Sequence, residues 1–176
     1  MLLKLESPKL LSDIVSIISE LVNEVRIKIN KEGMSLTAID PANVAMVYFK
    51  IPADLFSQFN LEKEEVLGVS LESLKSVLRR CGIGSSLTIE KEDNLLKLRI
   101  QDRIKRDFTL ELIDIEAEEK QMPQWEFKSV IKMDSGAFVE VIEDCLVVSD
   151  ACSFIASPNS FVIEAHGLNS ARLVPV

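Results

Sequence analysis

The sequence has little of what a membrane protein, a disulfide-bonded protein or a secreted protein would need. No apolar run approaches the roughly 18 residues that a helix needs to cross a bilayer. The N-terminal residues alternate like a strand and lack the charged-then-apolar build of a signal peptide, so none is expected. Cys81, Cys145 and Cys152 are odd in number and show no CxxC spacing. This pattern predicts reduced thiols in a cytosolic or nuclear-type compartment.

Features of a catalytic or cofactor-binding site are equally scarce. The only histidine, His166, follows an expected strand with Glu164 and has no nucleophile at motif spacing. No paired His or Cys spacing predicts zinc. The Gly82–Ser85 segment resembles a phosphate loop, but it lacks a third glycine and the P-loop lysine and follows a helix rather than a strand. We therefore expect no enzyme, no metal and no cofactor.

Positive charge is also in short supply. The 20 Lys and Arg residues stand against 28 Asp and Glu residues, which gives a net charge of −8. Phosphate contacts need clustered basic side chains, so a chain with a net negative charge is not expected to bind nucleic acid over its whole surface. A role at DNA would require the few basic residues to be concentrated on one face. Apolar residues, by contrast, make up 47% of the chain and are ample for a core.

One pattern, a strand, an amphipathic helix and then further strands, runs through the chain three times at a spacing of about 63 residues. Strict alternation of apolar and polar residues marks the strands, and apolar stripes at helical spacing mark the helices. The expected strands are Leu2–Leu5, Glu24–Ile29, Met34–Ile39, Val44–Ile51, Glu65–Ser70, Ser86–Lys91, Leu95–Gln101, Ile104–Leu112, Phe127–Met133, Ser153–Ser157, Ser160–His166 and Ser170–Val176. The expected helices are Pro8–Val22, Leu71–Arg80 and Ser135–Val148.

Local signals support these boundaries. Ser7 followed by Pro8 is typical of a helix start, and Gly82 is typical of a helix stop. The Lys31–Gly33 segment predicts a hairpin turn. A proline cannot donate a ladder hydrogen bond, so Asp40–Asn43 predicts a tight loop before the next strand.

An acidic stretch without glycine, residues 114–126, separates the second unit from the third. We interpret it as a connector between two similar domains. Residues 1–113 then hold two units, and residues 127–176 hold one unit, the first half of a second domain. A helix-plus-sheet unit cannot bury both apolar faces alone, so such repeats pair and leave edge strands for assembly. The sequence leaves open whether the chain ends naturally after this third unit or is truncated.

The repeat, the loop after the first hairpin and the connector together resemble the sliding clamps of the PCNA family, the archaeal members most closely. The matching segments run in order along essentially the whole chain: Asp40–Val47, Leu67–Val69, Phe108–Asp114 and Met133–Phe138. The resemblance implies an α+β DNA-clamp fold of repeated βαβββ units with helices on one face of antiparallel sheets. It also implies a non-catalytic processivity factor for DNA replication and repair. In the family, such subunits form a toroidal trimer that encircles duplex DNA, with helices lining the hole.

The resemblance implies a docking site for partner peptides beneath the connector. Val44 and Met46 are expected to share one face of a strand, with the end of the connector lying over them. An apolar hollow of this kind accepts a short helical turn with aromatic anchors, and methionine suits a surface that accepts varied partners. The alternative is that these residues are ordinary core. The site residues carried over are Ile39, Val44, Met46, Met122, Pro123 and Phe127.

The DNA-facing residues implied by the resemblance are Lys9 on the first helix and Lys75, Arg79 and Arg80 on the second. Non-specific DNA binding needs such phosphate contacts and little else. The alternative is a solvated charged face. The third helix departs from the family pattern, because it exposes acidic residues where clamp helices usually offer Arg or Lys. These residues are Glu140, Glu143 and Asp144.

The expected subunit interface joins the Ile104–Leu112 strand to the Ser170–Val176 strand of the next subunit, through Phe108, Leu110, Ala171 and Leu173. The alternative there is an inert or frayed terminus. Family resemblance implies duplex DNA, DNA polymerase, flap endonuclease, ligase and a clamp loader as partners, in a ring of identical or different chains. It implies a cytoplasmic, nucleoid-associated location in an archaeon and a nuclear one in a eukaryote. The rival interpretation is a truncated regulatory subunit that joins clamp subunits without gripping DNA.

Overall fold

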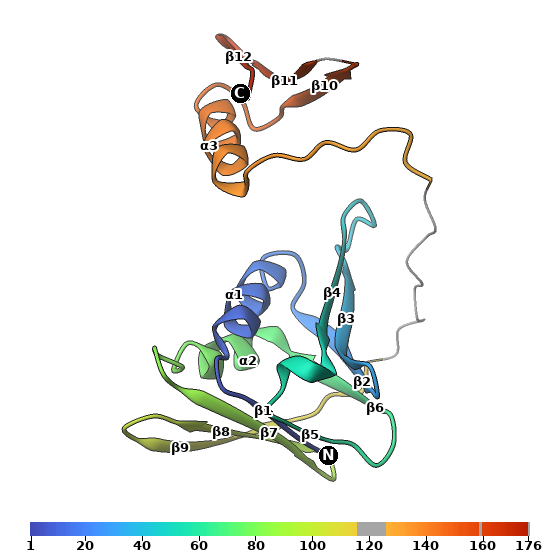
Figure 1. Cartoon of the computed structure of the whole chain (residues 1–176), viewed down its shortest axis with the longest axis vertical. Helices are drawn as coiled ribbons and strands as arrows, with labels where there is room; N and C mark the ends of the chain where they lie inside the picture. The colour runs from blue at the N-terminus through green and yellow to red at the C-terminus, as the bar shows by residue number, and fades with distance from the viewer. Residues whose placement is uncertain (116–125, 159, 176) are drawn as a thin grey trace. The chain divides into compact units, whose positions relative to one another are not determined.

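The computed structural model describes residues 1–115, 126–158 and 160–175. The chain forms two compact units, Met1–Met122 and Pro123–Val176, which we call unit 1 and unit 2. No helix within the described ranges is long and apolar enough to span a membrane. Each unit is considered by itself below, and Figure 1 shows its elements.

Unit 1 contains two half-units with the same order of elements (Figure 1). The first half-unit consists of β1 (Leu2–Leu5), α1 (Lys9–Ile18), β2 (Glu24–Asn30), β3 (Gly33–Ile39) and β4 (Met46–Pro52). A short 3-10 turn, η1 (Ala53–Leu55), and β5 (Gln58–Asn60) follow it. The second half-unit consists of β6 (Glu65–Ser70), α2 (Leu71–Leu78), β7 (Ser86–Glu92), β8 (Leu95–Gln101) and β9 (Lys105–Glu111). The βαβββ pattern expected from the sequence is therefore present twice.

The strands of unit 1 form two antiparallel sheets that mix the two half-units. One sheet has the order β5-β1-β7-β8-β9 and the other has the order β4-β3-β2-β6. The opening strand of each half-unit thus lies in the sheet of the other, because β1 pairs with β7 and β6 pairs with β2. The strand β5 was missed by the sequence analysis. It has only three residues and exists through its pairing with β1, which is a tertiary contact that local alternation cannot reveal.

The core of unit 1 follows from period-two alternation in the strands and helical periodicity in α1 and α2. In β2, Val25, Ile27 and Ile29 are buried while the residues between them are not. The helices α1 and α2 contact each other and add their own buried stripes to the same cluster. Burial of such side chains is worth roughly 1.5–3 kcal/mol each, so this continuous core stabilises unit 1.

Both helices of unit 1 are shorter than the sequence analysis predicted. Beyond Ile18 the chain tightens, since the Glu20 and Leu21 amides bond carbonyls three residues back, which is 3-10 geometry. The predicted capping role of Ser7 is wrong: Pro8 is the N-cap residue of α1 and no side chain caps this helix. At α2 the side chain of Ser70 does act as a cap, accepting a hydrogen bond from the amide of Ser73.

Gly33 allows the β2–β3 hairpin to turn against the neighbouring strand. Its φ is +139°, and a Cβ atom there would lie 2.1 Å from the carbonyl oxygen of Ile51. A larger residue would therefore push β4 away. The hairpin forms where the sequence predicted it, although β3 already begins at Gly33.

Unit 2 holds one half-unit with a small core. The helix α3 (Ser135–Leu146) lies against a sheet of order β10-β11-β12, formed by β10 (Ser153–Ser157), β11 (Ser160–His166) and β12 (Ser170–Leu173). Its buried cluster is Cys145, Ile163 and Ala165, with five half-buried apolar residues packed around it. The strand β12 ends earlier than expected, before Pro175, which has no N–H for a ladder bond.

The opening strand predicted for the third unit, Phe127–Met133, is not formed in the described structure. The physical reason lies in the pairing scheme of unit 1. There the first opening strand, β1, pairs with β5 and β7, which follow it far along the chain, from Gln58 and Ser86. Within the described ranges no strand pairs with residues 127–133. A lone extended segment has no ladder to stabilise it.

Candidate binding surfaces

The loop between β3 and β4 is built around the carboxylate of Asp40. Its Oδ1 accepts hydrogen bonds from the amides of Val44 and Ala45, both at 2.7 Å, and its Oδ2 accepts one from Ala42 at 3.2 Å. These bonds favour the ionised form, and the bond from Ala45 contributes most to lowering the pKa of Asp40. Asn43 takes a left-handed conformation, with φ of 57°. The result is a fixed loop, in which Val44 belongs to the turn rather than to a strand as predicted.

The predicted docking residues Ile39 and Met46 meet where this loop closes. They form a direct cross-strand pair between β3 and β4. The opposite face of β4 packs on the core through Val47, Phe49 and Ile51, so Met46 points to the outer face of the sheet, where it is 38% exposed. Val44 is exposed beside it in the loop. Large apolar side chains are therefore presented to solvent in one place.

Tyr48 belongs to the same outer face and was missed by the sequence analysis. It follows Met46 by two residues, lies opposite Thr37 on β3 and is 45% exposed. Strand alternation from Met46 was the available signal. An exposed aromatic next to an exposed methionine gives the patch both an anchor surface and an adaptable one.

The start of the connector crosses the same outer face at β6. The amide of Ile113 donates to the carbonyl of Gly68 at 3.0 Å. A Cβ atom on Gly68 would lie 2.0 Å from the carbonyl oxygen of Ile113 and 3.2 Å from the side chain of Ile115. Glycine is needed at this position because another backbone lies directly on it. The chain thus leaves β9 and lies against the edge strand β6 at Gly68.

The remaining docking predictions stay predictions. Met122 and Pro123 lie outside the described residues, so their position over the patch is not described. Phe127 is largely exposed and belongs to unit 2. The structure therefore brings together Ile39, Val44 and Met46, which we call the outer-face patch together with Tyr48.

The four residues predicted to face DNA differ in whether their positive charge is already paired with an acidic side chain. Lys9 pairs with Asp13 on the same helix at 2.7 Å. The Nζ of Lys75 bonds the hydroxyl of Ser19 at 2.8 Å and the carboxylate of Glu20 at 3.0 Å, which joins α2 to the chain after α1 and lowers the pKa of Glu20. Lys75 therefore already has a structural role.

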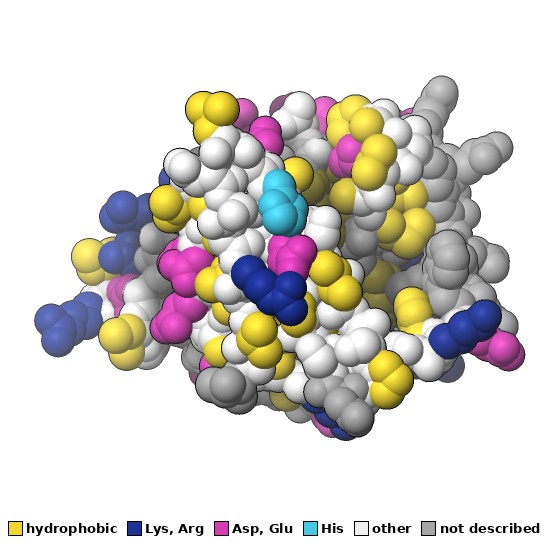
Figure 2. Space-filling model, turned by 90° about the horizontal axis from the view of Figure 1, so that it is seen from above, with side chains coloured by type: hydrophobic (Ala, Val, Ile, Leu, Met, Phe, Trp, Pro, Cys, Tyr) yellow, Lys and Arg dark blue, Asp and Glu magenta, His cyan; other side chains and the backbone are white. Residues whose placement is uncertain are grey.

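Arg79 and Arg80 are exposed at the end of α2 and form no salt bridge within the described parts of the chain. They are the basic side chains of the predicted set that remain available to a phosphate. On α3, by contrast, the acidic residues are exposed as the sequence suggested: Glu140, Glu143 and Asp144. On the face seen in Figure 2, basic side chains are scattered among apolar and acidic ones and form no continuous patch among the described residues.

The predicted interface residues lie on edge strands. The strand β9 pairs only with β8, and β12 pairs only with β11, within the described ranges. Phe108 and Leu110 of β9 are half-buried against the core of unit 1, and Leu173 of β12 packs on the core of unit 2. Ala171 is half-buried beside them on β12. Both edges leave backbone groups free to pair with another strand.

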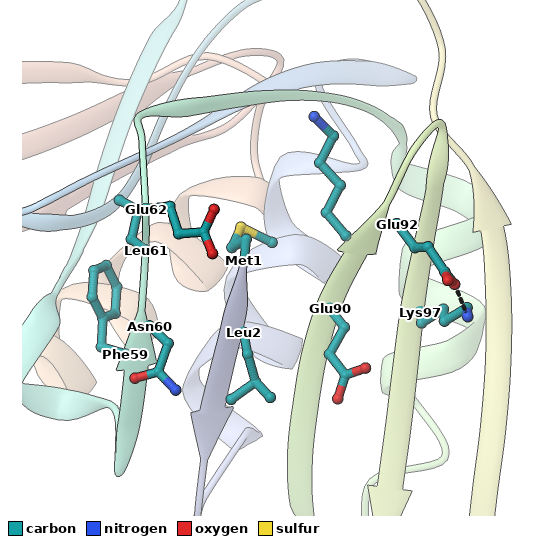
Figure 3. Close-up of a pocket in the computed structure, with 10 residues that line it drawn as sticks. Met1, Leu2, Phe59, Asn60, Leu61, Glu62, Glu90, Glu92 and Lys97 are labelled. Atoms are coloured by element: carbon teal, nitrogen blue, oxygen red, sulfur yellow. Dashed lines mark hydrogen bonds and ion pairs between the residues drawn. The ribbon is translucent and has the colours of Figure 1, made fainter.

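A hollow of about 760 Å³ lies away from the outer-face patch, near the N-terminus (Figure 3). Its walls come from β1, β5, β7 and β8, and several of its charged groups already have partners. Glu92 pairs with Lys97, and Lys91 bonds Glu65 at 2.6 Å. No nucleophile and base converge among the described residues that line it.

The other chemistry-bearing residues are also accounted for. His166 is exposed and lies 3.4 Å from Glu164, which bonds Arg172 at 2.7 Å. The three cysteines are free thiols. Among the described residues, no group of three or more His, Cys, Asp or Glu side chains is arranged to hold a metal ion.

Two solved structures share this architecture. PCNA from Thermococcus kodakaraensis superposes with a TM-score of 0.88 at 24% identity, covering 98% of this chain and 71% of that one. A PCNA2–PCNA3 complex from Sulfolobus tokodaii gives a TM-score of 0.83 at 24% identity, covering 99% of this chain and 72% of that one. The class of protein is thus a DNA-clamp fold.

The sequence comparisons identify the family. The family model described as proliferating cell nuclear antigen, N-terminal domain, matches residues 1–121. The DNA polymerase sliding clamp of Pyrococcus abyssi is 33% identical over 163 residues, or 92% of this chain and 66% of that protein. DNA polymerase sliding clamp 1 of Thermococcus kodakarensis is 32% identical, with the same two shares. This chain belongs to the proliferating cell nuclear antigen family, of the archaeal type, and it spans just under two thirds of the length of these relatives.

Proposed function

We propose that this chain is a sliding-clamp subunit, a non-catalytic processivity factor that assembles into a ring around duplex DNA and tethers replication and repair enzymes. The observation that carries the proposal is the repeated helix-on-sheet unit with open edges at β9 and β12, in a chain whose relatives are named DNA polymerase sliding clamps. Tethering of this kind raises the local concentration of an enzyme at DNA without new chemistry. Such a subunit would act wherever the DNA lies, in the cytoplasm of an archaeal cell.

The domain organisation proposed for this role has three parts. Residues 1–113 form a two-unit clamp domain, residues 114–126 form the connector, and residues 127–176 form the first half of a second domain. Assembly would pair β9 of one subunit with β12 of the next and so continue the sheets across the boundary. The half-buried side chains at these edges would be covered by that contact: Phe108, Leu110, Ala171 and Leu173. An edge strand with backbone groups free is suited to such addition.

The assembly is tested by light scattering on the whole chain, alone and mixed with a clamp subunit of a related archaeon. We expect ring-sized species whose stability falls when Phe108 is replaced by Ala. A matched control is Thr109→Ala on the same strand, since Thr109 is exposed and belongs to the other face. Association that is equally sensitive to both changes, or no association at any ratio, would contradict this part of the proposal.

The outer-face patch is the proposed docking site for polymerase, flap endonuclease, ligase and clamp loader. Support comes from the paired Ile39 and Met46, the exposed Val44 and Tyr48, and the connector that begins across β6. A short helical turn with aromatic anchors would place its apolar side chains on this patch. The roles of Met122, Pro123 and Phe127 are part of the same proposal.

Calorimetry with a peptide carrying a Gln-x-x-aliphatic-x-x-aromatic-aromatic motif tests the docking site. We expect binding that weakens on Met46→Ala, because truncation removes apolar contact from the middle of the patch. Leu55→Ala is the matched control, since Leu55 is another exposed apolar residue, in η1 outside the patch. The absence of heat and of competition would contradict docking here.

A second candidate function is a regulatory subunit that joins clamp subunits but does not itself grip DNA. Two observations favour it: Lys9 and Lys75 are already paired, and α3 exposes acidic side chains. The two candidates differ at Arg79. If this chain contacts DNA, binding to a short duplex should weaken with salt and with Arg79→Glu. Insensitivity to both would favour the regulatory role.

A further inference from the structure

The chain folds back on itself between Cys145, in the last turn of α3, and Cys152, which immediately precedes β10. The amides of Val148 and Ser149 both donate to the carbonyl of Cys145, at 2.9 and 3.0 Å, so the helix ends in a tight turn. The hydroxyl of Ser149 then accepts a hydrogen bond from the amide of Ala151 at 3.3 Å. These local bonds return the chain toward the end of the helix and bring the two cysteines together.

The two thiols meet inside unit 2. Cys145 is 2% exposed and belongs to the buried cluster of this unit, and Cys152 is half-buried against that cluster. Burial is the main cause that raises the pKa of the Cys145 thiol, and Cys152 raises that pKa further, by its charge and by accepting a hydrogen bond from the Cys145 thiol. Such a hydrogen bond requires the two sulfur atoms to be in contact, which is the starting arrangement for a disulfide.

The fold itself brings these two positions together, because the second half-unit of unit 1 has the same arrangement. Counted from the residues that cap α2 and α3, Cys81 stands where unit 2 has Cys145. Counted back from the closed ends of the two hairpins, Leu87 stands where unit 2 has Cys152. Cys81 and Leu87 both pack in the core of unit 1. Unit 2 differs in having a cysteine at both positions, so Cys81 serves as an internal control.

The loop that follows the helix lies at the surface in both units. Val147 is 85% exposed in unit 2, and Ile83, at the equivalent position after α2, is fully exposed in unit 1. The exposure of this loop is therefore a property of the half-unit, because it is the same where two half-units pack together. A small oxidant can approach the thiol pair from this side.

We propose that Cys145 and Cys152 form a reversible redox pair, which hydrogen peroxide converts from two thiols to one intramolecular disulfide. Cys152 reacts first, because burial leaves Cys145 with little thiolate. The Cys152 sulfur attacks one peroxide oxygen, the O–O bond breaks, and a sulfenic acid and a water molecule form. The Cys145 sulfur then displaces the sulfenic hydroxyl, which leaves as a second water. The cysteines lose two electrons and two protons, and the peroxide takes up both.

The disulfide would tie the end of α3 to the start of β10. Leu173 of β12 packs on the same cluster, so the cross-link would fix the core that holds this edge strand. A dithiol reductant reverses the bond by thiol–disulfide exchange. The pair therefore stays reduced in a reducing compartment and closes when peroxide is present. This redox chemistry is separate from the proposed clamp function and does not depend on it.

Intact-mass measurement of the whole chain, before and after hydrogen peroxide, tests the pair. We expect a loss of about 2 Da, the mass of two hydrogen atoms, and a peptide map that links Cys145 to Cys152 within one chain. Thiol labelling should then reach only Cys81, and a dithiol reductant should restore all three free thiols. Cys152→Ser should abolish the mass loss, whereas the matched control Cys81→Ser should leave it intact.

Hydrogen exchange measures the effect on unit 2 and needs no variant. Closing so short a loop should slow exchange of the Val148 and Ser149 amides by on the order of tenfold in the oxidised chain, and a dithiol should reverse the change. Three thiols that stay open to labelling after peroxide would overturn the inference. Links that involve Cys81 or join two chains would overturn it as well, as would unchanged exchange in the oxidised chain.

Discussion

Replacing Gly68 by alanine should release the start of the connector from β6. The added Cβ would lie 2.0 Å from the carbonyl oxygen of Ile113, and backbone atoms cannot yield as a flexible side chain can. The bond from the Ile113 amide to the Gly68 carbonyl would break with that displacement. One backbone hydrogen bond contributes about 0.5–1.5 kcal/mol, and the loss of apolar contact around Ile115 adds to it. We therefore expect the free energy of unfolding to fall by about 1–3 kcal/mol.

Gly82→Ala is the matched control, because a Cβ there meets only the Ser85 hydroxyl, at 3.9 Å. That change should be neutral or slightly stabilising, by about 0.4–1 kcal/mol, through lower entropy of the unfolded chain. The assay is denaturant unfolding followed by circular dichroism, combined with hydrogen exchange at the Ile113 amide. Equal stability of the two variants, with unchanged protection of Ile113, would refute the reasoning.

Three further predictions concern the loop, the core and the patch. The pKa of Asp40 is lowered in the fold, so its contribution to stability is present above the unfolded pKa and is lost as pH falls through the folded pKa. The protection of the Val44 and Ala45 amides from hydrogen exchange, relative to the unfolded chain at the same pH, should therefore fall on acidification, and Asp40→Asn should remove that pH dependence. Leu67→Ala should lower the free energy of unfolding of unit 1 by about 2–5 kcal/mol, measured by denaturant titration, because Leu67 is fully enclosed at the strand exchange. Tyr48→Ala should weaken peptide docking in calorimetry at least as much as Met46→Ala, and an unchanged affinity would remove Tyr48 from the patch.

The alternation of apolar and polar residues was sufficient to predict a strand wherever one face of that strand packs on the core. Alternation in β2, β7 and β8 predicts their bounds to within a residue, because each packs one face on the core and leaves the other partly exposed. Pattern failed where a strand depends on a distant partner. The short β5 exists only beside β1, and the segment 127–133 has the right alternation but no acceptor in the described structure.

The candidate sites also combine features that the sequence predicts with features that only the structure shows. Proline and the acidic side chain at Asp40–Pro41 predict a tight loop, but only the coordinates show that the Asp40 carboxylate holds Val44 out of the strand. The family resemblance predicts that Lys75 faces DNA, whereas the structure engages it with Ser19 and Glu20 from a segment far away in sequence. Side-chain partners of this kind are set by tertiary packing and cannot be derived from spacing alone.

The clamp account is tested most directly by topology on DNA. A closed nicked circle and the same DNA cut once differ only in whether a ring can slide off an end. The account predicts that rings containing this chain, once loaded by a clamp loader, stay on the circle through a high-salt wash and are lost from the cut molecule. Equal retention on both substrates, or none on either by rings of confirmed assembly, would contradict it.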